Sequence, residues 1–140
     1  MEYRGSCHCG AIGFTYRTSL APGEWSVRAC QCSFCRAHDA LSTSDPDGEI
    51  DFTAEVPGLL QRYRFGLGTA DFLICQRCGV YVGAAIKSDF GTFGIINTHA
   101  LSDAPANLAS AAPISYDAEN SEGRVSRRGQ RWTPVQQLPD

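Results

Sequence analysis

Three cysteines fall within six positions of the chain, at Cys30, Cys32 and Cys35. A C-x-C-x-x-C run lets three thiolates reach one ion, and soft sulfur ligands favour zinc over calcium or magnesium. Tetrahedral zinc takes four ligands, so this run leaves one position open to water or to a substrate. An open position is typical of a catalytic zinc site. The run therefore predicts a catalytic or labile zinc.

The other four cysteines form two pairs. Cys7 and Cys9 make a C-x-C, Cys75 and Cys78 make a C-x-x-C, and a glycine follows each pair. A tight turn that carries thiolates often needs a residue at positive φ, which glycine adopts at least cost. Two ligands from each pair complete a tetrahedral shell. The pairs therefore predict a structural four-cysteine zinc site, which would pin an early hairpin to a later one and supply folding energy.

A disulfide framework is the alternative use of these thiols. Seven cysteines are an odd number, so complete pairing would leave one thiol over. The segment Met1–Gly5 has no apolar stretch of the kind found in secretory signals. Thiols stay reduced in the cytosol. We therefore expect a cytoplasmic protein whose cysteines bind metal.

The composition is that of a single globular domain. The chain has 140 residues, of which 43% are hydrophobic and 19% are charged, and this length can bury a real core. No apolar run approaches the roughly 18 residues that span a membrane. The formal net charge is -3, so the chain has no overall attraction for nucleic acid. Neither a membrane nor a nucleic acid is expected as a partner.

The elements that must position the cysteines read mostly as short strands. In Ala11–Arg17 apolar residues alternate with polar residues or glycine, the period of a half-buried strand. Further strands are expected over Trp25–Cys30, Ile50–Thr53, Leu59–Phe65, Asp71–Ile74, Val80–Ile86 and Thr92–Asn97. Strong helical periodicity is not evident, and only Arg36–Leu41 suggests a short helix. Short strands between Gly/Pro turns predict a mainly β domain of antiparallel strands.

The C-terminal part has a different composition. Ala104–Pro113 is rich in alanine and proline, and we expect it to run over the surface. Ser121–Arg131 contains four arginines, and its default interpretation is a solvated tail. The alternative is an anion-binding arm. Trp132 could anchor this tail to the body of the protein.

The order and spacing of all seven cysteines resemble those of the glutathione-dependent formaldehyde-activating enzyme (GFA) family, which includes centromere protein V-like proteins. The shared motifs are Gly5-x-Cys7-x-Cys9-Gly10, Cys30-x-Cys32-x-x-Cys35-Arg36 and Cys75-x-x-Cys78-Gly79. The resemblance covers about residues 3–102 of a single domain at 1–140, and it leaves 103–140 as a C-terminal extension.

This resemblance implies an Mss4-like zinc-binding β fold that holds two zinc ions. It assigns the structural zinc to Cys7, Cys9, Cys75 and Cys78, and the catalytic zinc to Cys30, Cys32 and Cys35. It also implies a carbon–sulfur lyase reaction in the adding direction, the condensation of formaldehyde with glutathione to S-hydroxymethylglutathione. A small thiol and a small aldehyde are then the expected partners.

Three thiolates around a divalent zinc carry a net charge of about -1, so the site should be a weak Lewis acid toward water. We expect it to favour a substrate thiol in its thiolate form, which would attack an aldehyde held nearby. The alkoxide that results needs a proton donor. His38, three residues after Cys35, and His99 are the candidates.

Two positions beside the cysteines have more than one interpretation. His38 could be the catalytic proton donor, a fourth metal ligand or an ordinary surface residue. Arg36 could hydrogen-bond a thiolate or bind the carboxylate of a substrate. A fourth protein ligand would close the second site and favour the alternative function, a non-catalytic zinc-stabilised binding module.

Overall fold

The computed structural model describes all 140 residues as a mainly β protein. Its strands are β1 (Glu2–Ser6), β2 (Ile12–Arg17), β3 (Arg28–Cys30), β4 (Ser42–Thr43), β5 (Glu49–Ala54), β6 (Leu60–Tyr63), β7 (Asp71–Cys75), β8 (Tyr81–Ser88), β9 (Gly91–Asn97), β10 (Ala112–Ile114) and β11 (Thr133–Gln137). The helices are α1 (Ser33–His38) and α2 (Ser121–Arg131), with 3-10 turns η1 (Pro22–Glu24), η2 (Pro57–Leu59) and η3 (Thr98–Ala100). No helix combines the length and apolar character needed to span a bilayer.

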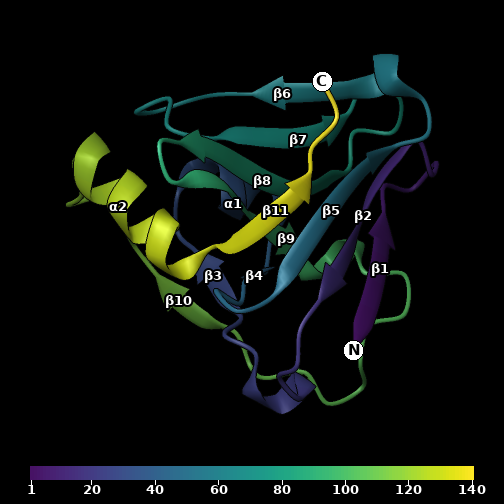
Figure 1. Ribbon diagram of the computed structural model, residues 1–140, viewed down its shortest axis with the longest axis horizontal. Helices are drawn as coiled ribbons and strands as arrows, with labels where there is room; N and C mark the ends of the chain where they lie inside the picture. The colour runs from purple at the N-terminus through teal and green to yellow at the C-terminus, as the bar shows by residue number, and fades with distance from the viewer.

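The strands form one branched sheet of eleven strands, in the order β1-β2-β5-β11-β9-β4-β3-β10, with β8, β7 and β6 added to the far side of β9. Most neighbours are antiparallel, as expected, but β11 runs parallel to β5 and β10 runs parallel to β3. Figure 1 shows β11 lying between β5 and β9. The last strand of the chain therefore joins the two halves of the sheet.

Two apolar clusters fill the interior. The larger has 16 buried residues and includes Tyr16, Trp25 and Phe52, packed against β1, β2 and β5. The smaller has nine, among them Cys35, Phe72 and Trp132. Because Cys35 belongs to this second cluster, the three-cysteine run is attached to the rigid interior and not to a loose loop.

The predicted strands around the cysteines are confirmed within a few residues. The helix expected over Arg36–Leu41 lies three residues earlier, at Ser33–His38. It begins there because the sulfur of Cys32 accepts the amide of Cys35 and caps the first turn. It ends at Asp39, which has a left-handed φ of 49°.

The expectation of a solvated tail was wrong, whereas no residue of Ala104–Pro113 is buried, as expected of a surface segment. Ser121–Arg131 is an eleven-residue helix and not a solvated tail, and Ala112–Ile114 within the preceding segment pairs with β3. The side chain of Asn120 accepts the amide of Gly123 at 2.8 Å, which caps α2. Trp132 is only 4% exposed, so it anchors this segment as expected. Residues 103–140 thus supply two strands and a helix to the fold.

Candidate metal centres and the adjoining cavity

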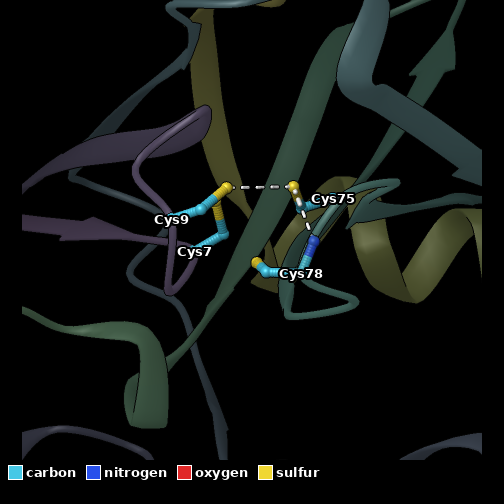
Figure 2. A group of neighbouring side chains, drawn as sticks. All are labelled: Cys7, Cys9, Cys75 and Cys78. Carbon is cyan, nitrogen blue, oxygen red and sulfur yellow. Dashed lines mark hydrogen bonds between the residues drawn. The ribbon is translucent and has the colours of Figure 1, made fainter.

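The four-cysteine set comes from two hairpin turns that are far apart in the sequence. The turn between β1 and β2 carries Cys7 and Cys9, and the turn between β7 and β8 carries Cys75 and Cys78 (Figure 2). The sulfurs of all four lie within 4.8 Å of one another, with 3.7 Å between Cys7 and Cys9 and 3.6 Å between Cys9 and Cys75. Tetrahedral zinc with Zn–S bonds of about 2.3 Å places its sulfurs about 3.8 Å apart.

The backbone of both turns is shaped to hold thiolates. Gly10 and Gly79 have φ of 83° and 80°, so the predicted left-handed glycines are confirmed. The amide of Ile12 donates to the sulfur of Cys7 at 3.4 Å, and the amide of Cys78 donates to that of Cys75 at 3.5 Å. Hydrogen bonds from amides favour the charged form of a thiol.

The environment also separates the pKa values of these thiols. Burial raises the pKa of Cys7 to about 11. The amide of Ala11, followed by the guanidinium of Arg77, lowers the pKa of Cys9 to about 6, and Arg77 lies 3.4 Å from that sulfur. A buried thiol that resists ionisation in the free protein is one that a metal ion would stabilise as thiolate. The donor set, spacing and hydrogen bonds all fit zinc.

The three-cysteine set lies where a strand becomes a helix. Cys30 ends β3, Cys32 caps α1, and Cys35 lies in the first turn of that helix. Their sulfurs also lie within 4.8 Å of one another. The amide of Gln31 donates to the carbonyl of Ile114 on β10 at 2.9 Å, which fixes the loop between the first two cysteines.

These three thiols lie together but differ in acidity. Hydrogen bonds from Cys30 and Cys35 lower the pKa of Cys32 well below its usual value. Hydrogen bonds with Cys30 and Cys32 raise the pKa of Cys35. Since all seven cysteines are free, no disulfide competes for either set. Three soft ligands in this arrangement fit zinc with one position left open.

A cavity of about 90 Å³ opens beside the three-cysteine set, and Cys30, Cys32 and Cys35 all contribute to its wall. Phe65, Phe72 and Trp132 are among its apolar lining residues. None of the cysteines of the other set lines this cavity. The two sets therefore differ as the sequence predicts: the four-cysteine set is complete, and the three-cysteine set faces an enclosed space.

Four arginines line the same cavity. Arg28 comes from β3, and Arg124, Arg127 and Arg128 come from α2. The only acidic side chain in the lining is Asp117, which is exposed. These positions fit the alternative interpretation of Ser121–Arg131, an anion-binding arm, better than they fit a solvated tail.

The residues expected to be catalytic lie outside the cavity lining. Arg36 and His38 are exposed on α1, and the ring of His38 lies 4.4 Å from that of Phe34 and 5.8 Å from that of Tyr81. His99 is exposed in η3. The backbone amide of Arg36 donates to the carbonyl of Cys32 at 3.0 Å, but no side-chain hydrogen bond joins Arg36 or His38 to a cysteine. A catalytic role for either stays a prediction.

Sequence reasoning missed several residues near the three-cysteine set. Arg28 precedes Cys30 by only two positions, and in a strand residues two apart share a face, which was the available signal. Thr69 and Tyr116 gave no signal, because their place in the lining depends on packing. Tyr81 is buried, its hydroxyl has no hydrogen-bond partner, and the charge of Cys35 adds to burial in raising its pKa.

Fold and site together define a class: a mainly β protein with one complete and one open set of cysteine ligands suited to zinc. The family model of the glutathione-dependent formaldehyde-activating enzyme matches residues 2–117. The chain therefore belongs to the GFA family, and α2 and β11 lie beyond the matched part.

One solved structure is similar, the crystal structure of a Rhodobacter sphaeroides protein from a structural genomics programme. It is 26% identical to this chain, with a TM-score of 0.55, and the match covers 78% of this chain and 99% of that one. The match uses nearly all of that protein and leaves about a fifth of this chain without a counterpart.

Proposed function

We propose that this protein is a zinc-dependent enzyme of the carbon–sulfur lyase type. It binds a small thiol, such as glutathione, beside Cys30, Cys32 and Cys35, and adds the sulfur to a small aldehyde. The observation that carries the proposal is the open cavity at this set of cysteines and its absence from the other set. Membership of the GFA family supports a glutathione-related role.

The reaction is an addition that needs no redox partner. The S–H bond of the thiol breaks, a C–S bond forms, the carbonyl π bond becomes a C–O single bond, and the proton ends on the new hydroxyl. When bound, zinc would supply positive charge that favours the thiolate form of the substrate. Free cysteines throughout the chain support a reducing, cytoplasmic setting.

The chain's own residues hold and enclose the reactants. Phe65 and Phe72 form apolar walls, so a bound aldehyde would meet the thiol with little competing water. Capping of α1 by Cys32 fixes the positions of Cys32 and Cys35 relative to each other. His38 is the proposed proton donor and Arg36 the proposed hydrogen-bond partner of a cysteine thiolate; both lie outside the cavity lining, so they would act from the solvent side of α1. Their exposure on α1 makes each accessible to solvent protons and ligands.

Zinc stoichiometry and thiol binding test this function together. We expect two zinc ions per wild-type chain and one in Cys32→Ser. In cobalt-substituted wild-type protein, glutathione or another thiol should shift the absorption bands of the cobalt, and this shift should be lost in Cys32→Ser. A wild-type chain that binds a single zinc would refute the two-site model. Two zinc ions without a response to any thiol would favour the non-catalytic binding module.

A further inference from the structure

Two of the four arginines in the cavity have no acidic partner. Arg128 is only 7% exposed, and no carboxylate lies within 4.0 Å of its guanidinium or of that of Arg28. One amine of Arg128 donates to the hydroxyl of Thr69 at 2.6 Å, while its buried Nε has no partner at all. Arg28 donates at 2.9 Å to the hydroxyl of Ser44. Arg28 also donates to the carbonyl of Ser26 at 3.2 Å, so both cations have neutral partners only, and the Nε of Arg128 has none.

The other two arginines of the cavity share one carboxylate. Arg127 forms a two-pronged contact with the carboxylate of Glu119, at 2.9 and 3.1 Å, and its guanidinium lies 3.5 Å from the ring centre of Tyr116. Arg124 lies 3.7 Å from the same carboxylate. Since Glu119 is shared by these two, it leaves no charge for Arg28 or Arg128.

Cysteine thiolates do not account for the two unpaired cations. No hydrogen bond connects Arg28 or Arg128 to a sulfur, although Arg77 makes such a contact at the other set. A buried charge without a partner is strongly unfavourable, so it persists where a ligand of opposite charge occupies the site in use. The guanidinium group matches a carboxylate in a planar, two-pronged geometry.

We infer that the cavity selects a small thiol that carries a carboxylate, with Arg128 and Arg28 binding the carboxylate while the sulfur reaches Cys30, Cys32 and Cys35. Binding of the sulfur at the three cysteines rests on the proposed function, whereas binding of the carboxylate rests on the two arginines alone. The cavity is lined by Arg28 and Arg128 as well as by the three cysteines, so one ligand in it can meet both the cations and the sulfurs.

Mercaptoacetate and 2-mercaptoethanol are a matched pair of probes, because they are similar in size and differ in charge. Each is titrated into the cobalt-substituted, full-length protein at the same pH. Mercaptoacetate should shift the cobalt bands at a concentration at least tenfold lower than 2-mercaptoethanol. Arg128→Gln should abolish this preference. Arg131→Gln, at the exposed last residue of α2, should keep it.

Each outcome separates the two proposals. Equal responses to mercaptoacetate and 2-mercaptoethanol would refute the selection for acids and leave the proposed function intact. No response to any thiol would refute the proposed function. The acid site is then tested without sulfur: acetate should raise the melting temperature of the zinc-loaded wild type and not that of Arg128→Gln. If Arg128→Gln fails to fold, Arg28→Gln takes its place in both assays, and an unchanged preference in that variant would overturn the inference.

Discussion

Replacement of Arg128 by methionine should stabilise the ligand-free protein. Burial, followed by the neighbouring Arg127 and Arg124, lowers the pKa of Arg128 from 12.5 to about 10. At 1.36 kcal/mol per pKa unit, the charge costs about 3 kcal/mol at neutral pH. Because the folded-state pKa of this base lies below the unfolded value, the cost is fully present below pH 10 and is relieved between about 10 and 12.5.

Two favourable contacts of Arg128 would be lost with the charge. The hydrogen bond to Thr69 contributes about 1 kcal/mol, and the guanidinium lies 4.6 Å from the ring centre of Trp132, a cation–π contact of about 1 kcal/mol. The methionine side chain keeps the apolar packing of the stem. The net expectation is therefore a gain of about 1 kcal/mol in the free energy of unfolding of Arg128→Met.

Urea unfolding at neutral pH, followed by circular dichroism at a fixed free zinc concentration, measures this difference. Arg131→Met is the matched control, since it removes the same charge from an exposed position in the same helix and should change stability by less than about 0.5 kcal/mol. A loss of stability of more than about 1 kcal/mol in Arg128→Met would show that the cation is structural. The argument that it is kept for a ligand would then fail.

Two further substitutions test the fold and the metal assignment. Cys75→Ser should lower the zinc content by one and the melting temperature by far more than Cys32→Ser does, because only the four-cysteine set links two hairpins; metal analysis and thermal scans check this. Gly83→Ala should cost about 1–3 kcal/mol, or roughly 3–10 °C in melting temperature, because its new Cβ would clash with the carbonyl oxygen of Ile95. A thermal midpoint within 1 °C of wild type would contradict the predicted clash.

The grouping of the cysteines could be predicted from the sequence because it depends on short-range spacing. Ligands two or three residues apart must face one ion, whatever the rest of the chain does. Zinc takes four ligands, so the two pairs of cysteines are expected to combine in one complete set and the run of three to form another. The structure brings Cys7 and Cys9 to Cys75 and Cys78 accordingly. Among the strands next to them, Ile12–Arg17 was also predictable, since it alternates apolar residues with polar residues or glycine.

Helix α2 could not be predicted in this way because it has no apolar stripe. Val125 is its one large apolar residue, and the rest of Ser121–Arg131 is charged, small or polar. Its stability comes from the cap at Asn120, from the arginine contacts with Glu119 and from Trp132 at its end, none of which produces a period in the sequence. The cavity was missed for the same reason: Arg28 and Arg128 are one hundred positions apart and meet only through packing.

The division between family and extension suggests how substrate choice is built. The part of the chain that matches the GFA model carries all seven cysteines and Arg28, whereas three of the four cavity arginines lie beyond residue 117. A member with the same cysteines and a different C-terminal segment would keep the metal chemistry and lose this acid site. Deleting the segment from this chain cannot test the idea, because β11 bridges β5 and β9 and its loss would open the sheet. Point substitutions in α2, which leave β11 paired, separate substrate selection from folding.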